Sequence, residues 1–259
     1  MPFANLQDVK IYYEFSGEAH LPVVMFSNCL GTNIRMWDPQ IEPFSERFRI
    51  LRYDTRGLGQ SGVTPGPYTI AQLSSDVVHL LDELQLERVH FCGLSMGGMT
   101  GIFLGANARS RFHKIVLCNT AAKIGTAETW NARIAAVEKD GMKAVSNSVI
   151  ERWLTPNFRS SRPAETKEIL AMLEASNPQG YAANCAAVRD IDQRDALTNI
   201  HLPCLVIAGT HDPGATPADG QALAKAIPAA IYAEMAASHL SNIEARDNFN
   251  QQVLKFLLA

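Results

Sequence analysis

The stretch Gly93-Leu94-Ser95-Met96-Gly97 decides the fold of this chain. It follows a short apolar run, residues 89–92, and opens a segment compatible with a helix from about Met96. This order predicts a strand, a sharp turn and a helix, with a serine at the turn. Such a turn is strained and needs small neighbours, and glycine stands on both sides of it. The pattern G-x-S-x-G in this context predicts a nucleophile elbow, where the helix N-terminus favours a developing oxyanion.

The composition is that of an ordinary globular protein. Hydrophobic residues make up 47% of the 259 residues, and the formal net charge is -3. These values favour one large domain with a substantial core and do not suggest nucleic acid or a membrane surface as a partner. The five cysteines lack the spacing of a metal site, so we expect no metal and free thiols.

The N-terminal residues and the apolar runs bear on localisation. Residues 1–10 lack the basic-then-apolar pattern of a signal peptide, and no apolar run approaches the roughly 20 residues of a membrane span. We therefore expect a cytoplasmic protein. Its oligomeric state has no signal in the sequence.

Short β-like runs alternate with helical patterns over most of the chain. Helices are predicted at 37–48, 69–84 and 242–258, and Thr69 with Gln72 predicts a capping box. Two antiparallel strands are predicted within 3–18, followed by strands at 23–26, 50–53, 89–92, 115–118, 205–208 and 231–235. Because these later strands are continuously apolar, we predict an α/β fold with a mostly parallel, eight-stranded sheet flanked by helices.

One region breaks the alternation. Residues 122–189 contain no convincing strand, and helices are predicted at 126–139, 141–153, 163–174 and 178–189. The region lies after the sixth strand. We therefore predict a core domain formed by residues 1–121 and 190–259, with residues 122–189 inserted as a helical lid.

Two further residues complete a candidate triad. Asp212 follows the strand predicted at 205–208, and His239 follows the last predicted strand. The chain order Ser95, Asp212, His239 is that of the α/β-hydrolase fold, and each residue lies just beyond the end of a strand, where ligands bind in such sheets. The alternative interpretation of Asp212 is a helix cap or turn residue, and that of His239 is a histidine in a surface loop. His211 precedes Asp212 and is expected to lie outside the triad.

An oxyanion hole needs two backbone N–H groups. Met96, directly after the nucleophile, supplies one. The second is expected from the loop 27–31, and its distance from the preceding strand assigns it to Cys29. Cys29 as the nucleophile is a weaker alternative, because a matching base is missing in the expected order.

The stretch Gly57-Leu58-Gly59-Gln60-Ser61-Gly62 matches a dinucleotide-binding pattern. That site needs a helix directly after the glycines, and the sequence continues instead with Pro65 and Pro67. We therefore expect no cofactor.

The predicted lid carries candidate substrate-binding residues. Trp130 and Arg133 are three positions apart and share a helical face, while Arg152 and Trp153 close the next helix. A guanidinium that faces a pocket suggests a carboxylate on the substrate. The alternative for each arginine is a solvated or ion-paired surface residue.

Together these segments resemble one known family, the 3-oxoadipate enol-lactonases of the β-ketoadipate pathway of aromatic catabolism. The matching segments are SNCLGT (27–32), RMWD (35–38), YDTRG (53–57), GLSMGG (93–98) and HLSNIE (239–244). The resemblance spans nearly the whole chain. It implies a serine hydrolase that opens a small enol-lactone bearing a carboxymethyl group, through a Ser-His-Asp triad and an acyl-enzyme, without a cofactor.

Two other functions remain open at this stage. One is a different serine hydrolase of the same fold, either a carboxylesterase or a carbon–carbon bond hydrolase of aromatic ring-cleavage products, since fold and triad do not separate these activities. The other is a non-enzymatic protein that binds a ligand in the same pocket. An intact triad argues against the second.

Overall fold

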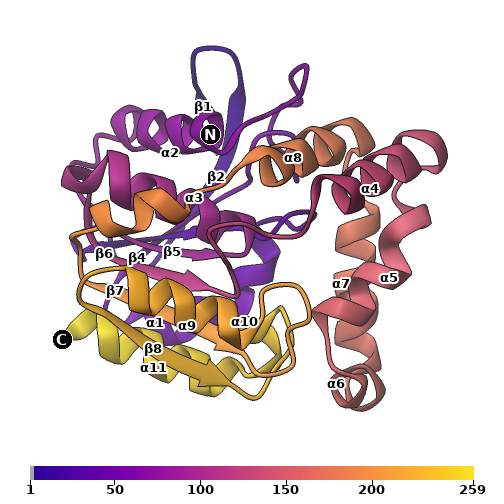
Figure 1. Ribbon diagram of the computed structural model, residues 1–259. Helices are drawn as coiled ribbons and strands as arrows, with labels where there is room; N and C mark the ends of the chain where they lie inside the picture. Colours follow the sequence, from indigo (N-terminus) through magenta and orange to yellow (C-terminus); the bar gives the residue numbers. More distant parts are fainter. Residues whose placement is uncertain (1–2) are drawn as a thin grey trace.

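An eight-stranded sheet forms the centre of the computed structural model, which describes residues 3–259 (Figure 1). The strand order is β1-β2-β4-β3-β5-β6-β7-β8, with β1–β2 and β2–β4 antiparallel and all other neighbours parallel. The predicted mostly parallel, eight-stranded sheet is therefore confirmed. The strands are β1 (Phe3–Asn5), β2 (Lys10–Ser16), β3 (Val23–Ser27), β4 (Arg49–Tyr53), β5 (Val89–Leu94), β6 (Phe112–Cys118), β7 (Cys204–Gly209) and β8 (Ala230–Met235).

Helices cover both faces of the sheet, because its central strands are apolar on both sides. In β3, Val24 and Phe26 pack into the core beneath α1 and α11, whereas Met25 packs into the core beneath α2, α3 and α9. This alternation is the period of two that a strand imposes on its side chains. The covering helices are α1 (Asp38–Ser45), α2 (Ile70–Glu83), α3 (Met96–Asn107), α9 (Pro217–Ala226) and α11 (Arg246–Leu258).

Five α-helices follow one another between β6 and β7 and gather at one side of the sheet (Figure 1). Four agree with the predicted helices. The additional one, α6, begins after Thr155, whose hydroxyl accepts from the N–H of Phe158 while Pro156 occupies the first turn. The five are α4 (Ala127–Asp140), α5 (Lys143–Trp153), α6 (Pro156–Ser161), α7 (Pro163–Glu174) and α8 (Pro178–Asp190).

The structure differs from the predicted helices in several further details. Thr69 caps α2 by accepting from the N–H of Gln72 over 3.1 Å, but α2 lacks the reciprocal bond of a capping box. The last predicted helix is divided at Ala245 into α10 (Ser241–Glu244) and α11. Helix α9 was not predicted, nor were the short 3-10 helices η1 (Ile34–Trp37), η2 (Arg109–Arg111) and η3 (Arg194–Asn199).

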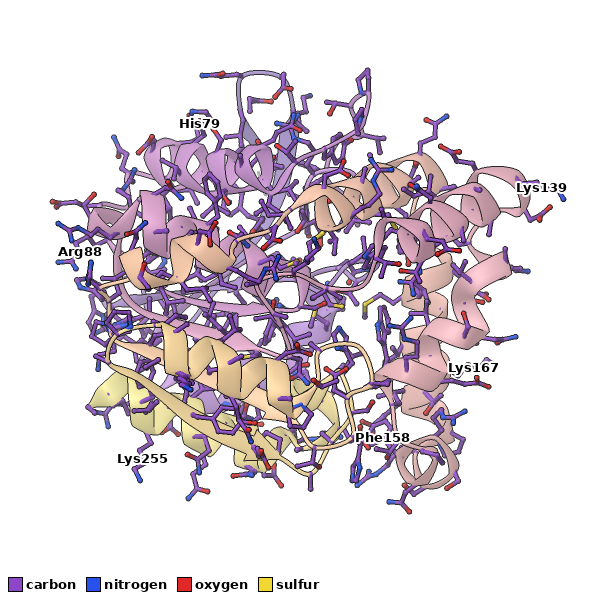
Figure 2. All side chains as sticks on the ribbon, in the orientation of Figure 1. His79, Arg88, Lys139, Phe158, Lys167 and Lys255 are labelled. Atoms are coloured by element: carbon purple, nitrogen blue, oxygen red, sulfur yellow. The ribbon has the colours of Figure 1, made fainter. Side chains whose placement is uncertain are left out.

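Charged side chains surround the molecule. Arg88, Lys139, Lys167 and Lys255 project outward from different elements (Figure 2). Within residues 3–259, no helix combines the length and the apolar character needed to cross a membrane.

Candidate active site

Ser95 occupies a strained turn between β5 and α3. Its φ of 58° and ψ of -113° lie in a sparsely populated region, which costs on the order of 1–3 kcal/mol. A Cβ on Gly93 would approach the carbonyl oxygen of Gly97 to 2.2 Å, and a Cβ on Gly97 would approach that of Ser27 to 2.3 Å. Both glycines are therefore required by close backbone approach, which holds the serine at the top of the sheet.

His239 and Asp212 meet above the ends of β8 and β7. Nδ1 of His239 lies 2.6 Å from Oδ2 of Asp212, and both side chains are buried. The other carboxylate oxygen, Oδ1, accepts from the N–H groups of Gly214 and Ala215 over 2.8 and 3.1 Å. The carboxylate is thus fixed from both sides and holds the imidazole in one orientation.

The charges of this pair act on each other. Burial by itself lowers the pKa of His239, but the carboxylate of Asp212 outweighs it and raises that pKa above its ordinary value. Burial raises the pKa of Asp212, yet the charge and hydrogen bond of His239 bring that pKa below its ordinary value. Asp212 therefore stays ionised and makes the imidazole a stronger base.

The loop after β3 faces the elbow. Gly97 N–H donates to the carbonyl of Asn28 over 3.1 Å, which fastens the loop to the start of α3. The N–H of Cys29 donates to Sδ of Met36 over 3.3 Å, whereas the N–H of Leu30 has no hydrogen-bond partner within residues 3–259. Met96 N–H, at the first position of α3, is likewise without a partner in the described chain.

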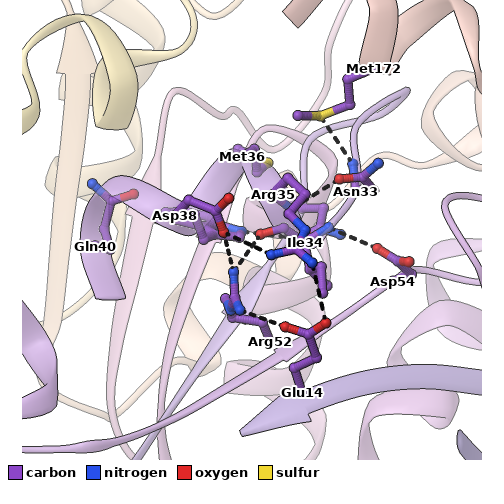
Figure 3. Close-up of polar contacts among 12 residues, drawn as sticks. Glu14, Asn33, Ile34, Arg35, Met36, Asp38, Gln40, Arg52, Asp54 and Met172 are labelled. Carbon is purple, nitrogen blue, oxygen red and sulfur yellow. Dashed lines mark hydrogen bonds and ion pairs between the residues drawn. The ribbon is translucent and has the colours of Figure 1, made fainter. Parts of the chain in front are cut away.

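The segment that follows this loop, η1, is anchored to β4 and the residue after it by hydrogen bonds to charged side chains (Figure 3). The N–H of Ile34 donates to Oδ1 of Asp54 over 2.8 Å, and the buried guanidinium of Arg52 donates to the carbonyl of Ile34 over 3.3 Å. Arg52 is itself held by Glu14 and Asp38, over 2.8 and 2.5 Å. This network fixes the position of Met36, and through it the loop below the elbow.

A pocket opens above Ser95 and His239 and extends under the helices α4, α5 and α8. All four lid residues predicted to bind substrate line it: Trp130, Arg133, Arg152 and Trp153. The Arg133 guanidinium lies over the Trp130 ring, 4.7 Å from its centroid, and the indole N–H donates to the carbonyl of Ile124 over 2.7 Å. Arg133 is half-buried, whereas Arg152 is exposed. The structure therefore places the candidate triad, Cys29 and the four lid residues around one pocket.

Comparison with known proteins places the chain among hydrolases. The family model described as the alpha/beta hydrolase fold matches residues 22–145. The chain is 42% identical over 247 residues to "3-oxoadipate enol-lactonase 2" of Acinetobacter baylyi, covering 95% of this chain and 92% of that protein. The chain belongs to the 3-oxoadipate enol-lactonase family of α/β-hydrolases.

Solved structures agree with this membership. The enol-lactonase family member from Burkholderia xenovorans LB400 superimposes with a TM-score of 0.98 at 44% identity, covering 100% of both chains. A thermophilic esterase from Thermogutta terrifontis, solved with malate bound, gives a TM-score of 0.90 at 26% identity, covering 96% of this chain and 93% of that one. The expected fold and the expected class of carboxylic ester hydrolase are confirmed for this member of the enol-lactonase family.

Two residues of the candidate site, Asn119 and Tyr181, were not predicted from the sequence. Asn119, after β6, donates from Nδ2 to Oδ2 of Asp212 over 3.1 Å and accepts at Oδ1 from the hydroxyl of Ser241 over 2.5 Å. Tyr181 of α8 lines the pocket and is buried. An asparagine directly after a predicted strand, at the edge that carries Ser95, was the one available signal for Asn119.

Proposed function

We propose that this protein hydrolyses 3-oxoadipate enol-lactone, a butenolide with a carboxymethyl group, to 3-oxoadipate. The observation that carries the proposal is the presence of two arginines beside the candidate nucleophile. Arg133 and Arg152 line the pocket of Ser95 and His239, and neither forms an ion pair with a carboxylate in the described part of the chain. Unpaired guanidinium groups in a pocket favour an anionic substrate. The names of relatives that are 39%, 42% and 44% identical to the chain support the same substrate.

In the proposed reaction, Ser95 is the nucleophile and His239 the base. His239 accepts the hydroxyl proton as the Ser95 oxygen attacks the lactone carbonyl, and Asp212 stabilises the resulting imidazolium. The oxyanion is bound by two backbone N–H groups. We assign these to Met96 and Cys29, because Cys29 lines the pocket and its N–H meets only the sulfur of Met36, a weak acceptor that an oxyanion displaces.

Collapse of the tetrahedral intermediate breaks the bond between the ring carbonyl and the ring oxygen. The ring oxygen leaves as an enolate, which takes a proton from His239 and ketonises. An enolate is a better leaving group than an alkoxide, and ketonisation disfavours closure of the ring. Water, deprotonated by His239, then attacks the acyl-enzyme and releases the new carboxylic acid from Ser95.

The substrate carboxylate is assigned to Arg133. Its guanidinium is half-buried and stacked on Trp130, so it loses less freedom on binding than the exposed Arg152. A hydrogen bond to a charged group contributes about 1.5–3 kcal/mol. Trp153 forms an apolar wall of the pocket, and residues 122–189 act as a lid over the core made of residues 1–121 and 190–259.

A substrate panel tests the function. The enol-lactone, p-nitrophenyl acetate and a vinylogous 1,5-diketone acid are compared on the wild-type protein and on Ser95→Ala. We expect fast turnover of the lactone, slower cleavage of the ester and no turnover of any substrate by Ser95→Ala. Slow lactone turnover with fast ester cleavage would instead assign the protein as a carboxylesterase. Preferential cleavage of the diketone would assign it as a carbon–carbon bond hydrolase, and binding without turnover would leave only a binding function.

A further inference from the structure

The loop that carries His239 is hydrogen-bonded to the end of helix α5. Before the histidine, the hydroxyl of Ser238 donates to the carbonyl of Arg152 over 2.7 Å. After it, the N–H of Leu240 donates to the carbonyl of Trp153 over 3.1 Å. Both carbonyls belong to the last turn of α5, where a helix has no N–H of its own to offer them. The loop of the candidate base therefore supplies the partners that the helix end needs.

The carboxylate of Glu244, at the end of α10, joins the same two parts of the molecule a second time. Its Oε2 accepts from the N–H of Ser238 over 2.8 Å and from the N–H of Thr155 over 3.3 Å. Its Oε1 accepts from the hydroxyl of Thr155, the residue that caps α6. One carboxylate is thus shared between the residue that precedes His239 and the connection between α5 and α6.

These hydrogen bonds account for the position of Glu244 without an ion pair. Within residues 3–259 no cationic side chain pairs with it, and Arg246, two positions on, pairs with Glu165. Ser238 is 3% exposed, and its N–H donates to no other group in the described chain. Loss of the carboxylate would leave that buried N–H without a partner, which costs free energy unless the loop moves.

The end of α5 contributes to the pocket as well as to the histidine loop. The side chains of Arg152 and Trp153 line the pocket, while their carbonyls are bonded to the two neighbours of His239. On the core side, Nδ2 of Asn119 donates to the carbonyl of Ser238 over 3.1 Å. The backbone beside His239 is therefore held by the core from one side and by the helical insertion from the other. A shift of α5 would be transmitted to the imidazole.

We propose that Glu244 is a positioning residue that couples the lid to the base of the reaction, by holding Thr155 and the backbone beside His239 in one arrangement. The inference rests on the role of His239 in the proposed function, but not on the identity of the substrate. Because one carboxylate fixes both the base and a wall of the pocket, its loss should change turnover as well as binding. A residue that only capped α6 would leave the turnover of a small ester unchanged.

The matched variants are Glu244→Ala, which removes both oxygens, and Glu244→Gln, which keeps one acceptor for the N–H of Ser238. For Glu244→Ala we expect kcat on p-nitrophenyl acetate to fall about tenfold, because the base is displaced. On the enol-lactone KM should also rise about threefold, since Trp153 lines the pocket. Glu244→Gln should keep kcat within about threefold of wild type. Glu168→Ala, at an exposed position of α7, is the control and should change neither quantity.

A double-mutant cycle tests the coupling itself. Thr155→Val removes the hydroxyl on the lid side and leaves the His239 loop untouched, so a fall in kcat on the ester reports transmission through Glu244. The double variant Glu244→Ala/Thr155→Val should then lose no more than Glu244→Ala alone. Full additivity, or a Thr155→Val variant with the kcat of wild type, would overturn the proposal in favour of a cap on α6.

An NMR measurement gives a second readout that needs no turnover. The proton between Nδ1 of His239 and Oδ2 of Asp212 should give a downfield signal that shifts or exchanges faster in Glu244→Ala and keeps its position in Glu168→Ala. An unchanged signal in Glu244→Ala would overturn the proposal. If Glu244→Ala melts below the assay temperature, Thr155→Val decides by the same two measurements. Cleavage of the ester without turnover of the lactone would overturn the proposed function and leave the ester kinetics to decide on Glu244.

Discussion

Nδ2 of Asn119 lies 3.1 Å from the carboxylate oxygen of Asp212 that also meets Nδ1 of His239 at 2.6 Å. Asn119 is 1% exposed, and its own oxygen is held by Ser241. A residue 93 positions away in the sequence therefore adds a hydrogen bond to those that His239, Gly214 and Ala215 make with the buried carboxylate.

Removing this amide should slow the reaction without unfolding the protein. Asn119 has a φ of 46°, so Asn119→Gly deletes the side chain without adding backbone strain. A hydrogen bond to a charged group contributes about 1.5–3 kcal/mol, which corresponds to a fall in kcat of about 10–100-fold. Steady-state kinetics on the ester and the lactone measure it. Asn107→Ala, at an exposed position, is the control, and equal effects of the two variants would contradict a role in orienting Asp212.

The charge of Asp212 should be visible in the pH dependence. The carboxylate raises the pKa of His239 above its ordinary value, and the reaction requires the neutral imidazole. Asp212→Asn removes the charge, so the pKa of His239 should fall and the acidic limb of kcat/KM should move to lower pH. Loss of the orienting group should also reduce kcat by about 10³–10⁴-fold. An acidic limb that stays in place in Asp212→Asn would show that a group other than His239 controls it.

The two pocket arginines should differ in their effects. Arg133→Ala is expected to reduce kcat/KM for the carboxylated lactone about 10–100-fold, at about 1.4 kcal/mol per decade, and to spare p-nitrophenyl acetate. Arg152→Ala should have a smaller effect on the lactone, because solvent screens the exposed side chain. Arg162→Ala, an exposed residue paired with Glu165 on α7, is the control. Equal losses on lactone and ester in Arg133→Ala would rule out recognition of the carboxylate.

Two carboxylates bind the same arginine, and the buried one should contribute more to the free energy of unfolding than the exposed one. Arg56 pairs with the buried Asp76 over 2.6 Å and with Asp8, whose side chain is 58% exposed, over 2.7 Å. Asp76→Ala leaves a buried guanidinium short of a partner and should lower the free energy of unfolding by about 3–5 kcal/mol. Asp8→Ala, the matched control, should cost at most about 1 kcal/mol. Urea unfolding followed by circular dichroism measures both, and similar midpoints for the two variants would contradict the assignment.

Local patterns in the sequence were sufficient to predict most of the fold. The apolar runs predicted the strands, and the glycines around Ser95 predicted the turn, because a strained φ and close backbone approach leave few other residues possible there. The chain order of Ser95, Asp212 and His239 predicted which loops meet, because parallel strands place their carboxyl ends at one edge of the sheet. The short helices η1, η2, η3 and α6 were missed, since one or two turns give too little periodicity to detect. Helix α9 was missed as well, because Gly220 and Leu223 are its only buried positions.

The hydrogen-bond partners of individual site groups depend on tertiary contacts that no local sequence pattern encodes. Spacing from the strand assigned an oxyanion donor to Cys29, but the contact of that N–H with Sδ of Met36 is visible only in the structure. Likewise, Asn119 became a partner of Asp212 only when β6 and β7 paired side by side. The sequence by itself thus determined the fold, the family and the residues that gather at the pocket, because these follow from periodicity, turn chemistry and chain order. Only the tertiary structure decided which N–H, carboxylate and guanidinium groups are already engaged and which remain available to a substrate, because a hydrogen bond depends on distances of a few tenths of an ångström between segments far apart in the chain.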